Sequence, residues 1–178
     1  LAHGFGERLK RSIGLGLSPR QVHASLAHAP SVENGCVSSD ASPEFDEFAF
    51  LPVLAQQRDT AVPVVKRVNL ALPDGRTLSA LRWGDAASPA PRLVFLHGAG
   101  LNAHKWNATL TALGSSNLGA SALALDLPGH GDSSWRDDAD YRAHTLAPDV
   151  VAALREWTTT PVVLIGQSLG GLTAAAVA

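Results

Sequence analysis

The stretch VVLIGQSLGG at residues 162–171 decides how the rest of the chain is interpreted. It opens with an apolar run that is typical of a strand buried within a sheet. A helix of small residues is predicted to begin at Leu169. Between the two, Gly166 and Gly170 flank Ser168 in the pattern G-x-S-x-G, which in this context predicts a sharp turn from strand into helix.

This turn makes Ser168 a candidate nucleophile, because it would hold the serine in a strained backbone conformation with an exposed hydroxyl. Gly166 and Gly170 are expected because a Cβ at either position would collide with the neighbouring strand or helix. The N-terminus of the following helix would point free N–H groups at the site, so the N–H of Leu169 can stabilise an oxyanion. The structural alternative is a Gly/Ser-rich turn that only caps a buried helix.

A second oxyanion donor is expected after the apolar run at residues 93–96, where the sequence continues His-Gly-Ala-Gly. The backbone N–H of Ala99 would point at the substrate oxygen, and an alanine offers no competing side-chain amide. His97 precedes the tight turn at Gly98, and we expect it to hydrogen-bond to the backbone and hold this loop. We therefore do not assign it as the general base.

The rest of the sequence predicts an α/β fold. Residues 64–83 contain two alternating segments around a Pro-Asp-Gly turn, which predicts an antiparallel hairpin. Continuous apolar runs predict parallel strands buried on both faces, and apolar residues at helical spacing predict helices between them. The expected strands are 93–96, 122–125 and 162–165, and the expected helices are 105–113, 146–157 and one from residue 169. This order predicts a three-layer sandwich with a mostly parallel sheet and an N-terminal hairpin.

Residues 1–65 are expected to form a helical or linker extension, with the main domain at 66–178. Ser18 and Pro19 predict a helix start. Residues 44–57 have helical apolar spacing, which Pro52 is predicted to break or kink. The expected contacts of this extension with the main domain are Phe45, Phe48 and Phe50.

Together these motifs resemble the α/β-hydrolase fold family, in the branch with a short His-Gly-x oxyanion loop. The matching segments are LVFLHGAG at 93–100, LDLPGHGDS at 125–133 and LIGQSLGG at 164–171. The resemblance covers about residues 66–178. It implies that Ser168 is the nucleophile, that Ala99 and Leu169 form the oxyanion hole, and that the supporting residues are His97, Gly98, Gly166, Gln167 and Gly170. The middle segment implies a loop-holding role for Asp126, His130 and Asp132.

The sequence departs from the family pattern in three ways. Gln167 stands where histidine is common, and a serine nucleophile argues against haloalkane dehalogenase or epoxide hydrolase chemistry. The family places its catalytic acid and histidine after the strand-to-helix turn that carries the nucleophile, which is called the elbow. This sequence ends ten residues after Ser168. We therefore expect a C-terminally truncated serine hydrolase, with a fold that is incomplete after the elbow helix. The 178-residue chain alone is expected to be inactive.

The substrate stays open at this point, because carboxylic esters, lactones, C–C bonds and peracid chemistry all fit the motifs. One alternative function is a catalytically inactive hydrolase-fold module that only binds. Another is a Rossmann-type dinucleotide-binding protein. Residues 98–103 fit G-x-G-x-x-A after a strand, and Asp126 ends the next strand, where a ribose-binding acid would lie.

Composition narrows the range of partners. The formal net charge is −2, and no basic stretch suggests nucleic acid or an anionic membrane. Charged residues interrupt the first 17 positions, so no signal peptide is predicted. The single Cys36 favours a reducing compartment, and we expect a cytoplasmic location. No cofactor motif or metal-ligand spacing is found, and a small-molecule substrate is the expected partner.

Overall fold

The computed structural model describes residues 46–85, 87–114 and 121–178. All of these residues belong to one compact unit, Phe45–Ala178. The helix predicted from Ser18 and the contact predicted for Phe45 lie outside the described residues.

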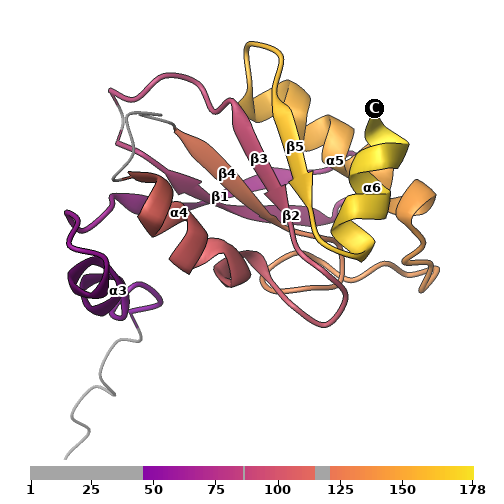
Figure 1. The fold of residues 1–178 in the computed structure, drawn as a ribbon. Helices are drawn as coiled ribbons and strands as arrows, with labels where there is room; N and C mark the ends of the chain where they lie inside the picture. Colours follow the sequence, from indigo (N-terminus) through magenta and orange to yellow (C-terminus); the bar gives the residue numbers. More distant parts are fainter. Residues whose placement is uncertain (1–45, 86, 115–120) are drawn as a thin grey trace, which may run out of the picture. The chain divides into compact units, whose positions relative to one another are not determined.

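A five-stranded mixed sheet forms the centre of this unit, in the order β1-β2-β4-β3-β5 (Figure 1). The strands are β1 (Val65–Ala71), β2 (Thr77–Trp83), β3 (Leu93–Leu96), β4 (Ala122–Asp126) and β5 (Val163–Gly166). β1 and β2 form the predicted antiparallel hairpin, and β2 also runs antiparallel to β4. β3 runs parallel to both β4 and β5, which confirms the predicted parallel core.

The parallel register brings the functional loops to one edge of the sheet. Leu96, the last residue of β3, lies opposite Leu125 of β4 and Gly166 of β5. The loops that leave the carboxyl ends of these three strands therefore start side by side. In open α/β sheets this edge is where ligands bind.

Helices cover both faces of the sheet and complete the three layers (Figure 1). They are α3 (Leu51–Gln57), the 3-10 helix η1 (Ala103–Trp106), α4 (Asn107–Gly114), α5 (Ala143–Trp157) and α6 (Leu169–Val177). One hydrophobic cluster joins the sheet to α5 and α6 through residues such as Leu146 and Val150. The other joins it to α3 and α4 through Leu51, Phe95 and Leu110. Of the helices described, none is long and apolar enough to cross a membrane.

Two details differ from the sequence predictions. Pro52 does not break a helix but lies in the first turn of α3, where its missing N–H leaves no hydrogen bond unmade. β5 is only partly buried in this chain: it is the last strand in the sheet order, and Val163 is 59% exposed. Phe48 packs against the second cluster, as expected for a contact of the N-terminal segment.

A substitution at Val94 tests whether the centre of the sheet is buried and well packed. Val94→Ala should lower the free energy of unfolding by about 2 kcal/mol, because it removes two methyl groups from a packed site. Val94 is 0% exposed, whereas Val53 on α3 is 55% exposed and provides a matched control. Val53→Ala should change stability by no more than about 0.5 kcal/mol. Urea denaturation of both variants measures the difference, and equal losses would contradict this description of the core.

Candidate active site

Ser168 lies at the sharp turn between β5 and α6, in a backbone conformation that few residues with a side chain adopt. Its φ is 50° and its ψ is −117°. Such a conformation costs about 1–3 kcal/mol and persists only where the surroundings enforce it. Ser168 is exposed, and its side chain does not cap α6. The strained backbone and exposed position predicted from the sequence are therefore both present.

Two glycines allow this turn to pack closely. A Cβ at Gly166 would approach the carbonyl of Gly170 to under 3.0 Å, and a Cβ at Gly170 would approach the carbonyl of Leu96 equally closely. Real Cβ atoms essentially never come this near to backbone atoms. The predicted collisions are confirmed, and they show that the start of α6 lies directly against the end of β3.

The loop after β3 lies beside Ser168. A Cβ built on Gly98 would be 3.5 Å from the Cβ of Ser168 and 3.5 Å from the carbonyl oxygen of Gln167. The N–H of Gln167 donates to the carbonyl of Leu96 at 3.1 Å, which fixes the elbow to β3. Within the described ranges, no group accepts a hydrogen bond from the N–H of Ala99 or Leu169. The two expected oxyanion donors are thus free and belong to adjacent segments.

His97 is fully buried and holds the loop, as the sequence predicted. Its Nε2 accepts the N–H of Leu127 at 3.0 Å, so its Nδ1 carries the proton and donates to the carbonyl of Gly98 at 2.8 Å. Burial lowers the pKa of His97, which favours this neutral form. Both ring nitrogens are occupied, so His97 is not placed to take a proton from Ser168.

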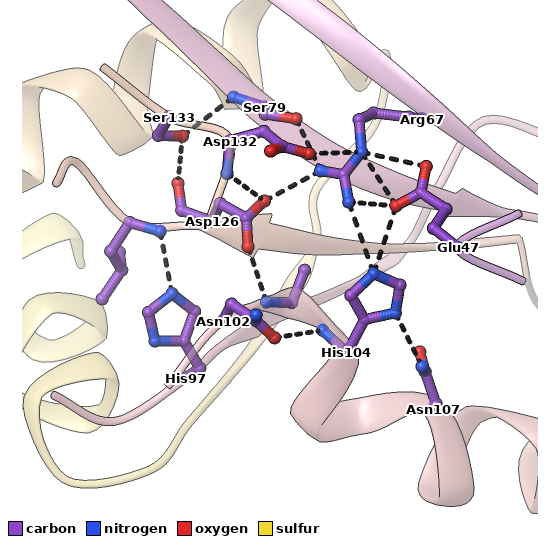
Figure 2. Close-up of polar contacts among 12 residues, drawn as sticks. Glu47, Arg67, Ser79, His97, Asn102, His104, Asn107, Asp126, Asp132 and Ser133 are labelled. Atoms are coloured by element: carbon purple, nitrogen blue, oxygen red, sulfur yellow. Dashed lines mark hydrogen bonds and ion pairs between the residues drawn. The ribbon is translucent and has the colours of Figure 1, made fainter. Parts of the chain in front are cut away.

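Asp126 holds the other end of the same loop (Figure 2). Its Oδ1 accepts the N–H of Ala103 at 2.6 Å, and its Oδ2 accepts the N–H of Asp132 at 3.2 Å. Asp126 is 1% exposed and is also paired with Arg67. A ribose hydroxyl would find this carboxylate already bonded, so the geometry does not match a dinucleotide site.

His130 and Asp132 also make loop contacts. His130 Nδ1 lies 3.0 Å from the carbonyl oxygen of Pro128, and its ring packs 5.0 Å from that of His97 between centroids. Asp132 pairs with Arg67 at 2.8 Å. The contacts of Asp126, His130 and Asp132 agree with the loop-holding role expected for this segment.

Sequence reasoning missed three residues beside this loop. Arg67 on β1, Glu47 before α3 and His104 on η1 lie together in Figure 2. The hydrogen bonds from Arg67 hold the pKa of the Glu47 carboxyl below its usual range. Arg67 is 20 residues from Glu47 and 59 from Asp126 along the chain, so no local sequence pattern connects them.

A cavity of about 450 Å³ adjoins the loop. Its lining includes Leu101, whose Cδ1 lies 3.8 Å from the Cβ position built on Gly98. The remaining lining residues are Gly100, Asn102, Lys105, Gly129, His130 and Gly131. The hollow has the size of a small-ligand site, and Ser168 is not among the residues that line it.

The described part of the chain supplies no partner for the Ser168 hydroxyl. The described histidines are His97, His104, His130 and His144, and none of them hydrogen-bonds to Ser168. The first three make the contacts given above. Over the same ranges, no group of three or more His, Cys, Asp or Glu side chains is arranged to hold a metal ion.

Gly170 provides a test of the contact between α6 and β3. Gly170→Ala should lower the free energy of unfolding by about 1–3 kcal/mol, because the new methyl group must displace backbone. Gly114, at the end of α4, has nothing within 4 Å of its Cβ position and serves as the control. Gly114→Ala should be neutral or stabilise by up to about 1 kcal/mol. If urea denaturation shows Gly170→Ala to be as stable as Gly114→Ala, the close contact is wrong.

The buried, neutral His97 should make the folded chain less stable as the pH falls. Its pKa is lower in the folded chain than its ordinary value of 6.5, so protons favour the unfolded state. The stability it contributes is complete above pH 6.5 and declines as the pH falls below that value. Between about pH 7.5 and about pH 5.5, wild type should therefore lose more unfolding free energy than His97→Gln, by up to about 1.4 kcal/mol per pH unit. Equal losses would mean that His97 is not buried in its neutral form.

Comparison with known proteins agrees with this geometry. Residues 93–178 match the model of the alpha/beta hydrolase family. The chain is 41% identical over 140 residues to esterase Rv0045c of Mycobacterium tuberculosis, which covers 78% of this chain and 43% of that protein. It is 40% identical over 89 residues to protein phosphatase methylesterase 1 of Bos taurus, covering 48% of this chain and 23% of that protein.

A solved structure of the Mycobacterium tuberculosis esterase superposes with a TM-score of 0.64 at 41% identity. The superposition covers 75% of this chain and 42% of the esterase chain, so the present chain spans less than half of its relatives' length. The sheet order, the elbow at Ser168 and the esterase relatives lead to the same conclusion: this chain is a member of the alpha/beta hydrolase family and carries part of its fold.

Proposed function

We propose that the complete gene product is a serine hydrolase that cleaves carboxylic esters, with Ser168 as its nucleophile. The observation that carries this proposal is the strained, exposed Ser168 beside two backbone N–H groups that have no other acceptor in the described part of the chain. Strain of this kind is costly, and it gathers at sites where it serves function.

In the proposed reaction, Ser168 Oγ forms a bond to the ester carbonyl carbon and gives up its proton to a general base. The carbonyl oxygen becomes an oxyanion, which accepts hydrogen bonds from the N–H groups of Ala99 and Leu169. The bond to the alcohol oxygen then breaks, and the alcohol leaves with a proton. Water attacks the acyl-serine in the same way, releasing the carboxylic acid and restoring the Ser168 hydroxyl.

The general base is assigned to neither His97 nor any other described histidine. The family order of serine, acid and then histidine assigns both remaining triad members to positions later than the elbow. Without a base, Ser168 has an ordinary hydroxyl and is a weak nucleophile. The 178-residue chain alone is therefore proposed to be inactive.

We favour ester cleavage over lactone, C–C bond and peracid chemistry because the relatives are named as esterases. The mycobacterial relative is an esterase, and the bovine relative is a methylesterase. A module that only binds would retain the fold and the cavity, but it would not react with a mechanism-based probe.

Labelling and turnover of the complete gene product test this proposal together. A fluorophosphonate should add covalently to Ser168, as read by peptide mass spectrometry, and small p-nitrophenyl and methyl esters should be hydrolysed. Ser168→Ala should abolish labelling and lower kcat by roughly 10⁴-fold or more. Ser88→Ala is the control, since the Ser88 hydroxyl bonds to Asp85 in a loop after β2 and should matter to neither readout.

Labelling that persists in Ser168→Ala would show that Ser168 is not the nucleophile. A wild type that neither labels nor turns over any of these esters would favour the binding module instead. Turnover by the 178-residue chain above that of its own Ser168→Ala variant would contradict the assignment of the base to later positions.

A further inference from the structure

Arg67 brings together three carboxylates from two distant segments of the chain, Glu47 from one and Asp126 and Asp132 from the other (Figure 2). Its Nη1 donates to Asp126 Oδ2 at 2.9 Å, and its Nε lies 2.8 Å from Asp132 Oδ2. Its Nη2 donates to Glu47 Oε2. Because a guanidinium presents its donors in a fixed planar fork, these contacts fix the orientation of the whole group.

The Asp126 carboxylate depends on this arginine. Asp126 is 1% exposed, and a buried carboxylate without a cation nearby is strongly disfavoured. The Asp126 oxygen opposite the arginine accepts the N–H of Ala103, and charged acceptors make stronger hydrogen bonds than neutral ones. Removing the cation would therefore weaken or displace the acceptor that holds Ala103.

Ala103 ends the loop that carries Ala99. His97 fixes the beginning of this loop through Leu127, and Asp126 fixes its end through Ala103, so both anchors come from the carboxyl end of β4. The position of the Ala99 N–H relative to Ser168 follows from these two anchors. A misplacement of about 1 Å at such a donor can cost on the order of 100-fold in rate.

We propose that Arg67 is a positioning residue for the loop at residues 97–103, here called the oxyanion loop. It acts through Asp126 and is held in place by Glu47 and Asp132. The catalytic part of this inference rests on the proposed function. Its structural part, that Arg67 holds the loop, does not. Glu47 also lies 3.1 Å from Nε2 of His104 on η1, so the segment before α3 supports the same region from a second direction.

Arg76 offers a matched control. It lies in the turn between β1 and β2 and is 16% exposed, against 18% for Arg67. Its Nη1 donates to Asp149 Oδ2 at 2.7 Å, so it also neutralises a largely buried carboxylate. That carboxylate belongs to α5 and makes no hydrogen bond to the oxyanion loop in the described part of the chain.

The test uses the complete gene product with Arg67→Met, Arg67→Lys and Arg76→Met, kept well below their unfolding temperatures. Amide hydrogen exchange of the peptide spanning residues 97–105, read by mass spectrometry, reports on the loop without requiring activity. Exchange in this peptide should become faster in Arg67→Met and stay at the wild-type rate in Arg76→Met. With an ester substrate, kcat should fall about 10-fold in Arg67→Met while KM stays within about 2-fold, because only a transition-state interaction is weakened.

Arg67→Lys should recover part of both effects, since it restores the charge but not the fork. Unchanged exchange in Arg67→Met would overturn the proposal whatever the activity. Faster exchange with an unchanged kcat, or an equal fall of kcat in Arg76→Met, would overturn the positioning role in catalysis. If wild type lacks Ser168-dependent turnover, the proposed function fails, and the exchange result alone decides whether Arg67 holds the loop.

Discussion

The contact between the start of α6 and the end of β3 is the constraint on which the site depends. Gly170 lies so close to the Leu96 carbonyl that no side chain fits between them. This contact brings the first turn of α6 against the loop that leaves β3, and the N–H of Gln167 reinforces it by donating to Leu96. The serine between the two glycines is thereby held in a conformation that it would not adopt alone.

Charge and hydrogen bonding then hold the loop that follows β3 in position. The carboxyl end of β4 supplies two consecutive anchors, the Asp126 carboxylate and the Leu127 N–H, and each holds one end of the oxyanion loop. The cost of burying Asp126 is offset by Arg67, which comes from the antiparallel hairpin. The hairpin and the segment before α3 therefore support this loop, through Arg67 and Glu47.

Features that depend on residues close together in the sequence could be predicted. The hairpin, the parallel strands, the strain at Ser168 and the backbone contacts of His97 each follow from short patterns, because local spacing determines them. Pro52 was misjudged because a proline at a helix start and one inside a helix differ only in where the helix begins. The Arg67 cluster could not be predicted, since it depends on which distant segments become neighbours in space.

The proposed function requires that Ala99 and Leu169 present their N–H groups to a single oxygen beside Ser168. A crystal structure of the complete gene product with a phosphonate bound to Ser168 measures this directly. One phosphonyl oxygen should lie within about 3 Å of both backbone nitrogens, with Ser168 still at a positive φ. An oxygen that contacts neither nitrogen, or a phosphonate attached to another residue, would contradict it.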